Sequence, residues 1–199
     1  DAVFSTHDVP NIYHVPLMLQ EQGLCNILGL DCESNGLLDE WRKMALHLDT
    51  LVEEIRIAMV GKYTGLSDAY LSVIKSLQHA AMAVDRKLVI DWVEASHLED
   101  DWSNAEESVT AWQMLKGADG ILVPGGFGDR GIEGKIIAAN YSRVNNIPYL
   151  GICLGLQVAT IEFCRNVLGL TGANSTEFDE NIEHAAVVFM PEISKTHLG

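Results

Sequence analysis

From residue 55 onward, short apolar runs alternate with longer segments of helical periodicity. The apolar runs that predict strands are residues 55–60, 87–94, 120–124, 149–152 and 185–189, and the segments that predict helices are residues 68–85, 105–116, 132–145 and 154–168. Continuous apolar strands separated by helices are typical of a mostly parallel sheet that is covered on both faces. We therefore expect an α/β fold with a mostly parallel sheet flanked by helices on both faces.

The first 50 residues lack this alternation. Pro16 favours a helix over residues 16–22, residues 25–35 are loop-like, and Gly36 precedes an amphipathic helix over residues 37–51. The change in pattern predicts two parts, residues 1–50 and residues 51–199.

Composition excludes some classes of partner and compartment. With 13 Lys and Arg against 28 Asp and Glu, the formal net charge is −15, so no basic stripe is available for a nucleic-acid backbone. The sequence has neither a membrane-length apolar run nor a secretory signal in residues 1–10. None of the four cysteines forms a CxxC pair. We expect a reduced, cytoplasmic chain with no membrane or nucleic-acid partner and no metal site, in which Cys25, Cys32 and Cys164 are inert.

One cysteine lies in a nucleophile-elbow motif. Residues 151–155 (GICLG) come at the end of a predicted strand and at the start of a predicted helix. Such a turn holds the nucleophile in strained backbone geometry, and the flanking glycines avoid clashes. The helix dipole would stabilise the Cys153 thiolate, and the Leu154 N–H would point toward a developing oxyanion. A buried core cysteine is the alternative, but the two glycines and the strand-to-helix position favour a nucleophile.

A second glycine-rich segment, residues 124–131 (PGGFGDRG), follows another predicted strand. Its glycine spacing matches a dinucleotide-binding loop, but residues 135–160 contain no acid to bind the ribose. A phosphate-binding P-loop is excluded because Asp129 and Ile136 stand at the positions of its first glycine and its Ser or Thr. We interpret the segment as an oxyanion loop that presents backbone N–H groups, with a plain tight loop as the alternative.

The general base that a cysteine nucleophile needs is not evident among the seven histidines. Only His184 and His197 follow the elbow, and neither has a convincing acidic partner. We therefore expect the base to lie outside this chain. Residues 174–178 (NSTEF) are, on their own, a polar loop or a weak helix cap.

Five segments, taken together and in order, resemble a single family over nearly the whole chain. They are residues 7–19 (HDVPNIYHVPLML), 60–73 (VGKYTGLSDAYLSV), 123–135 (VPGGFGDRGIEGK), 148–159 (PYLGICLGLQVA) and 173–179 (ANSTEFD). They resemble the CTP synthase family, and the later segments resemble its class I glutamine amidotransferase domain. The elbow alone is typical of class I amidotransferases in general, whereas PGGFG-x-RG with NSTEF is specific to CTP synthases.

The resemblance implies a two-part ligase of pyrimidine biosynthesis. In that family a synthase (amidoligase) domain phosphorylates UTP with ATP and Mg²⁺, and the amidotransferase domain hydrolyses glutamine and passes ammonia to it. GTP activates glutamine hydrolysis and CTP inhibits the synthase. The resemblance further implies a homo-oligomer, a dimer or homotetramer that can form filaments. It makes residues 1–50 the C-terminal tail of the synthase domain with its linker, and residues 51–199 the N-terminal part of a flavodoxin-like amidotransferase domain that is incomplete at its C-terminus.

The resemblance also implies roles for individual residues. It makes Cys153 the nucleophile that forms a glutamyl thioester, and it makes Gly126 and Leu154 the backbone donors of the oxyanion hole. A carboxylate at Glu177 would accept hydrogen bonds from the substrate ammonium. The implied glutamine-binding set is Gly126, Leu154, Gly155, Leu156, Gln157 and Glu177. Val15 would belong to the ATP adenine pocket, and Arg130 and Glu133 would lie near the GTP effector site.

Parts of the family pattern are absent from this chain. The His-Pro-Glu motif that completes the triad, and an Arg for the substrate carboxylate, are expected after Gly199. The residues for UTP, Mg²⁺ and triphosphate are expected before Asp1. We therefore expect a fragment that is poorly active alone and holds no cofactor of its own. Two alternatives stay open. One is a class I amidotransferase for another acceptor, against which residues 7–16 and 61–70 argue. The other is a non-catalytic regulatory or assembly module with a vestigial elbow.

Overall fold

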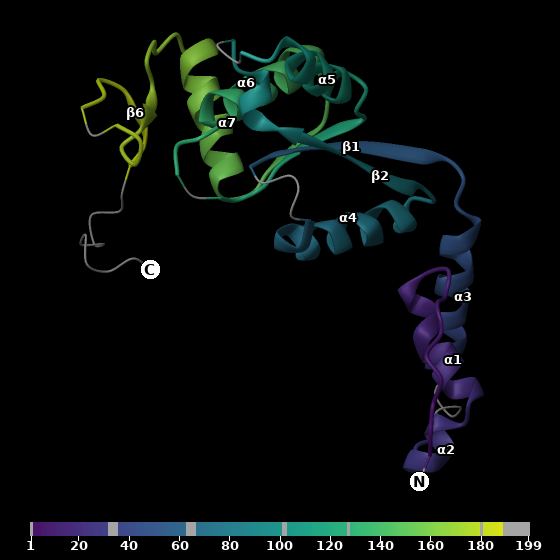
Figure 1. The fold of residues 1–199 in the computed structure, drawn as a ribbon. Helices are drawn as coiled ribbons and strands as arrows, with labels where there is room; N and C mark the ends of the chain where they lie inside the picture. Colours follow the sequence, from purple (N-terminus) through teal and green to yellow (C-terminus); the bar gives the residue numbers. More distant parts are fainter. Residues whose placement is uncertain are drawn as a thin grey trace. The chain divides into compact units, whose positions relative to one another are not determined.

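The computed structural model, drawn in Figure 1, describes residues 2–31, 36–62, 67–100, 103–126, 128–179 and 181–188. The chain forms two compact units: Asp1–Glu54 with Gln78–Lys87, and Ile55–Leu77 with Leu88–Gly199. Among the described residues, no helix is both long enough and apolar enough to cross a membrane.

The first unit is helical. Its elements before residue 54 are η1 (Ile12–His14), α1 (Val15–Glu21), α2 (Leu24–Leu28) and α3 (Leu37–Thr50). Asn11 caps η1 because its side chain accepts a hydrogen bond from the Tyr13 N–H at 2.9 Å. The indole of Trp41 in α3 donates to the Tyr13 carbonyl at 2.6 Å, and the two rings meet edge to face. These contacts join η1 to α3.

Two expectations for this unit are wrong. Residues 25–28 belong to the short helix α2 rather than to a loop, because Gly23 and Gly29 adopt left-handed conformations that bound one helical turn. Cys25 is disulfide-bonded, not a reduced thiol. A search for local cysteine motifs does not detect a bond whose formation depends on how the chain folds. The expectation for Cys32 lies outside the described residues.

A four-stranded sheet of order β2-β1-β3-β4 organises the second unit. Its strands are β1 (Glu54–Gly61), β2 (Lys87–Glu94), β3 (Gly120–Val123) and β4 (Tyr149–Gly151). β3 is buried along its whole length and pairs in parallel with β1 and with β4. The expected mostly parallel sheet is confirmed. Because parallel neighbours need crossover connections, the strands alternate with helices along the chain.

The connecting helices and 3₁₀ turns lie close to their predicted positions, except for η3, which was not expected. They are η2 (Ser67–Tyr70), α4 (Leu71–Ala83), η3 (Ala95–Leu98), α5 (Ala105–Lys116), α6 (Ile132–Asn145) and α7 (Leu154–Asn166). Asn104 caps α5 by accepting from two backbone N–H groups, and Gly117 ends it. The predicted helix over 68–85 begins instead with the 3₁₀ turn η2, and α7 ends two residues early. α6 packs on α7 and on η3, and α6 and α7 are labelled in Figure 1.

A second, two-stranded sheet was not expected. β5 (Asn174–Ser175) pairs in parallel with β6 (Ala185–Val187). Part of the NSTEF segment is therefore a strand rather than a loop or cap. The predicted strand at 185–189 does form at residues 185–187, but it joins this small sheet instead of the main one.

A buried carboxylate links α6 to α7. Glu162 is 2 % exposed and accepts hydrogen bonds from Asn140 at 2.8 Å, Asn166 at 3.1 Å and Arg143 at 2.8 Å. Burial alone raises the pKa of Glu162, but the hydrogen bonds and the Arg143 charge outweigh it, so its pKa lies below the ordinary value. The ionised, fully bonded carboxylate therefore stabilises the pair of helices.

We expect Glu162→Gln to lower the free energy of unfolding by about 1–3 kcal/mol at pH 7, because a bonded, buried charge is removed. The folded-state pKa is depressed, so this contribution is present above the unfolded pKa and is lost as the pH falls through the folded value. Urea unfolding at pH 7 and at acidic pH measures both effects, with the exposed Glu183→Gln as a control. A difference from wild type that is equally large at both pH values would contradict this account.

Candidate active site

Cys153 occupies a strained turn between β4 and α7. Its backbone φ of 54° and ψ of −109° are rare for a non-glycine residue and persist only where the surrounding structure over-determines them. The Cys153 carbonyl accepts from the N–H groups of Leu156 at 3.0 Å and Gln157 at 3.2 Å, which starts the helix. The thiol is free and exposed. Cys153 therefore presents a free, exposed thiol at the N-terminus of a 13-residue helix.

Two glycines allow the backbone to close around this turn. A Cβ on Gly151 would collide with the backbone of Gly155, and a Cβ on Gly155 would collide with the carbonyl oxygen of Val123 in β3. The start of α7 thus lies directly on β4 and β3. No residue with a side chain fits at either position without moving the backbone.

The glycine-rich loop after β3 lies against the elbow. A Cβ on Gly125 would stand 3.3 Å from the Cys153 Cβ and 3.9 Å from its Sγ, and a Cβ on Gly126 would stand 4.0 Å from the Leu154 side chain. Within the described part of the chain, the N–H groups of Gly126 and Leu154 make no hydrogen bond. The structure thus brings the Gly125–Gly126 backbone close to Cys153 and Leu154, and the N–H groups of Gly126 and Leu154 have no hydrogen-bond partner among the described residues. Gly126 itself does not have the positive φ that makes glycine necessary.

The other end of this loop is anchored on η3. Gly131, at φ 77°, is the N-cap of α6, and a Cβ on Gly134 would collide with the carbonyl oxygen of Ala95. The Gly134 N–H donates to the Glu99 carboxylate at 3.1 Å, and Arg130 pairs with Glu94 at 3.2 Å. The loop is therefore held at both ends, by the elbow and by η3.

Cations gather beside the loop despite the net charge of −15. The Lys62 Nζ lies 3.4 Å from where a Cβ of Gly128 would stand. Lys135 in α6 is 3 % exposed. Burial lowers the pKa of Lys135, the nearby Lys62 charge lowers it further, and Glu94 acts in the opposite direction. Arg130, which is paired with Glu94, is a third cation beside this glycine-rich loop.

Arg130 and Glu133 line one cavity of about 770 Å³. Glu133 is held by the Arg165 guanidinium at 2.7 Å. Ser96 and Asn174 also line this cavity, and each has a buried polar atom without a hydrogen-bond partner among the described residues. The cavity therefore has polar groups that a ligand or water can satisfy.

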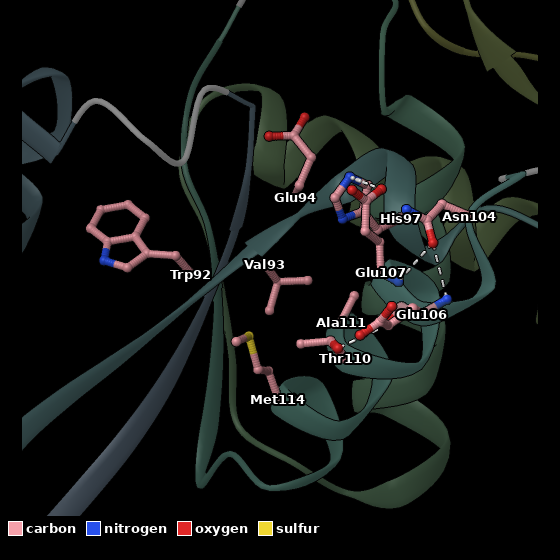
Figure 2. Close-up of a pocket in the computed structure, with 10 residues that line it drawn as sticks. All are labelled: Trp92, Val93, Glu94, His97, Asn104, Glu106, Glu107, Thr110, Ala111 and Met114. Carbon is pink, nitrogen blue, oxygen red and sulfur yellow. Dashed lines mark hydrogen bonds and ion pairs between the residues drawn. The ribbon is translucent and has the colours of Figure 1, made fainter.

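A second cavity of about 440 Å³, shown in Figure 2, lies between β2, η3 and α5. In it His97 pairs with Glu107 at 3.5 Å, and Asn104 caps α5. None of the predicted site residues lines it. Its acidic lining is thus separate from the predicted thiol site.

The remaining predicted residues have varied environments. Leu156 is 64 % exposed and Gln157 is half-buried in the first turn of α7. Glu177 is exposed and follows β5, where its N–H donates to the Ser175 hydroxyl. Val15 begins α1 in the first unit. Within the described ranges, no group of three or more His, Cys, Asp and Glu side chains could hold a metal ion.

Among the described residues, no histidine side chain forms a hydrogen bond with the Cys153 thiol. His184 contributes its backbone carbonyl to the Asn174 N–H in the small sheet, and His197 lies outside the described residues. Sequence reasoning also missed two residues that contact the elbow. Gly125 was detectable, since it stands in the Gly-Gly pair. Tyr149, whose hydroxyl bonds to Gly155, gave no sequence signal because its partner is a backbone carbonyl.

Comparisons with known proteins agree with these observations. The family model described as Glutamine amidotransferase class-I matches residues 65–193. CTP synthase of Dictyostelium discoideum is 53% identical over 219 residues, which cover 100% of this chain and 38% of that protein. CTP synthase of Eremothecium gossypii is 50% identical over 216 residues, again 100% of this chain and 38% of that protein. The chain thus spans 38% of the length of both relatives.

A solved structure supports the same assignment. The Trypanosoma brucei CTPS glutaminase domain with bound acivicin is 46% identical, with a TM-score of 0.61, and the match covers 69% of this chain and 50% of that chain. The family match, the mostly parallel sheet and the cysteine elbow all point the same way: the chain belongs to the class-I glutamine amidotransferase family.

Proposed function

We propose that this chain is the glutamine-hydrolysing part of a CTP synthase, and that Cys153 is its nucleophile. The carrying observation is the strained, exposed Cys153 against which the Gly125–Gly126 loop packs. The whole protein would aminate UTP to CTP with ATP, Mg²⁺ and ammonia released from glutamine. The similarity to two CTP synthases over the entire chain supports this choice over a class I amidotransferase for another acceptor.

The proposed chemistry begins with attack of the Cys153 thiolate on the carboxamide carbon of glutamine. The carbonyl oxygen becomes an oxyanion, which the N–H groups of Gly126 and Leu154 stabilise. The amide nitrogen takes up a proton and leaves as ammonia, and a glutamyl thioester remains on Cys153. Water then cleaves the thioester to give glutamate and the free thiol. The family resemblance assigns the proton transfers to a His-Pro-Glu motif outside this chain.

Substrate contacts are proposed for groups close to the thiol in the sequence. Gly155, Leu156 and Gln157 form the first turn of α7 immediately after Cys153, where they can contact the glutamine chain. Glu177 is exposed, and its carboxylate suits the substrate ammonium.

Nucleotide roles are proposed for other parts of the chain. Arg130 and Glu133 line one cavity, and the resemblance assigns them to a GTP effector site. Val15 is assigned to the ATP adenine pocket on the resemblance alone. Residues 1–50 are proposed as the end of the synthase domain with its linker, and residues 51–199 as amidotransferase. A cytoplasmic homo-oligomer follows from the same resemblance.

We expect acivicin, the ligand in the Trypanosoma brucei structure, to label Cys153 in the complete enzyme. Cys164 is the matched comparison, because it is a free thiol on the same helix but not at its N-terminus. Peptide mapping by mass spectrometry should place the label on Cys153, and Cys153→Ser should abolish it. Equal or faster labelling of Cys164 would refute the assignment of the nucleophile.

The oxyanion role predicts a difference between two substitutions at Gly126. Gly126→Pro deletes the N–H, and loss of one such donor costs about 2.7–4 kcal/mol in the transition state, or roughly a hundredfold or more in kcat for glutamine hydrolysis. Gly126→Ala keeps the N–H, and its Cβ has space in the structure. We expect it to retain kcat within about tenfold of wild type, since one added methyl does not remove the donor.

Steady-state glutamine hydrolysis, together with ammonia-dependent CTP formation as a folding control, measures this difference in the complete enzyme. Near-normal glutamine turnover by a folded Gly126→Pro enzyme would rule out the oxyanion role.

A further inference from the structure

A phenol connects the two sides of the elbow. Tyr149 opens β4, and its hydroxyl donates to the carbonyl oxygen of Gly155, in the first turn of α7, at 2.8 Å. Its bond therefore spans Cys153, from the strand before it to the helix after it. Among the described residues, no other side chain forms a hydrogen bond with the backbone of residues 151–155.

The strained turn needs support on both sides. On the strand side, the Ile152 N–H donates to the Val123 carbonyl at 3.0 Å, and Ile152 in turn accepts from the Gly155 N–H at 2.9 Å. On the helix side, the Gly155 carbonyl lies where the Tyr149 hydroxyl reaches it. Because the Cys153 conformation persists only when its neighbours over-determine it, loss of one tether should loosen the turn.

The environment of Tyr149 keeps its hydroxyl a donor. The ring packs against the core cluster that contains Leu154 and Val158. Burial raises the pKa of Tyr149 well above its ordinary value, and the charge of Glu162 raises it further. The phenol therefore stays protonated throughout the pH range in which a cysteine enzyme works.

We propose that Tyr149 is a positioning residue for Cys153. The Tyr149 hydroxyl fixes the first turn of α7, so that the Cys153 thiol and the Leu154 N–H keep their relative placement. This inference rests on the proposed role of Cys153 as nucleophile. Tyr149 does not touch the reacting atoms, so it should affect the rate of attack more than the binding of glutamine.

The test is Tyr149→Phe in the complete enzyme, with Tyr141→Phe as the matched control. Tyr141, in α6, is also partly buried against the core, and it meets Trp112 edge to face with ring centroids 5.9 Å apart. No described residue hydrogen-bonds to its hydroxyl.

For Tyr149→Phe we expect kcat for glutamine hydrolysis to fall about three- to tenfold, the effect of one hydrogen bond, with KM for glutamine unchanged. The rate constant for acivicin inactivation should fall by a similar factor, and Tyr141→Phe should match wild type.

Hydrogen exchange provides a second measurement that does not need full activity. In Tyr149→Phe, amides of residues 154–157 should exchange faster than in wild type, while amides of α6 should not change. Wild-type kcat and inactivation rate, or a raised KM at constant kcat, would overturn the positioning role. Failure of acivicin to label Cys153 in the wild type would instead overturn the proposed function, so the two failures are distinguishable.

Discussion

The candidate site depends on a close backbone contact between the elbow and the centre of the sheet. Gly155 lies against the Val123 carbonyl in β3, and Gly151 lies against Gly155. A side chain at either glycine would push α7 away from the strands. Because the packing is this close, Cys153 is forced into a conformation that it would not adopt in a free chain, and its thiol stands at the edge of the sheet beside the Gly125 backbone.

Cationic side chains surround the glycine-rich loop that lies against the elbow. The chain as a whole is strongly acidic, yet Lys62, Arg130 and Lys135 lie around the loop that faces the thiol. Glu94 offsets part of this charge and fixes Arg130. Cationic side chains near the site would stabilise an oxyanion formed in the proposed reaction. Arg130 also lines the cavity proposed for an effector.

Much of the fold could be predicted from local patterns. The apolar runs and helical periodicities gave the four strands of the main sheet and the helices α5 and α6, because burial on a parallel sheet imposes those patterns. Errors occurred where tertiary context decides. The turn α2 is bounded by two left-handed glycines, the NSTEF segment pairs with a strand ten residues further on, and the Cys25 disulfide depends on folding. The elbow was visible in the sequence because its glycines are a steric requirement, whereas the Tyr149 tether was not, because any backbone carbonyl can accept it.

The central claim is that Cys153 serves only to release ammonia from glutamine. The most direct measurement is CTP formation by the complete enzyme carrying Cys153→Ala, with glutamine and with ammonium chloride as alternative nitrogen donors. The account predicts that glutamine-dependent formation is lost and that ammonia-dependent formation stays close to wild type. Retained glutamine-dependent formation, or loss of both activities in a folded enzyme, would contradict it.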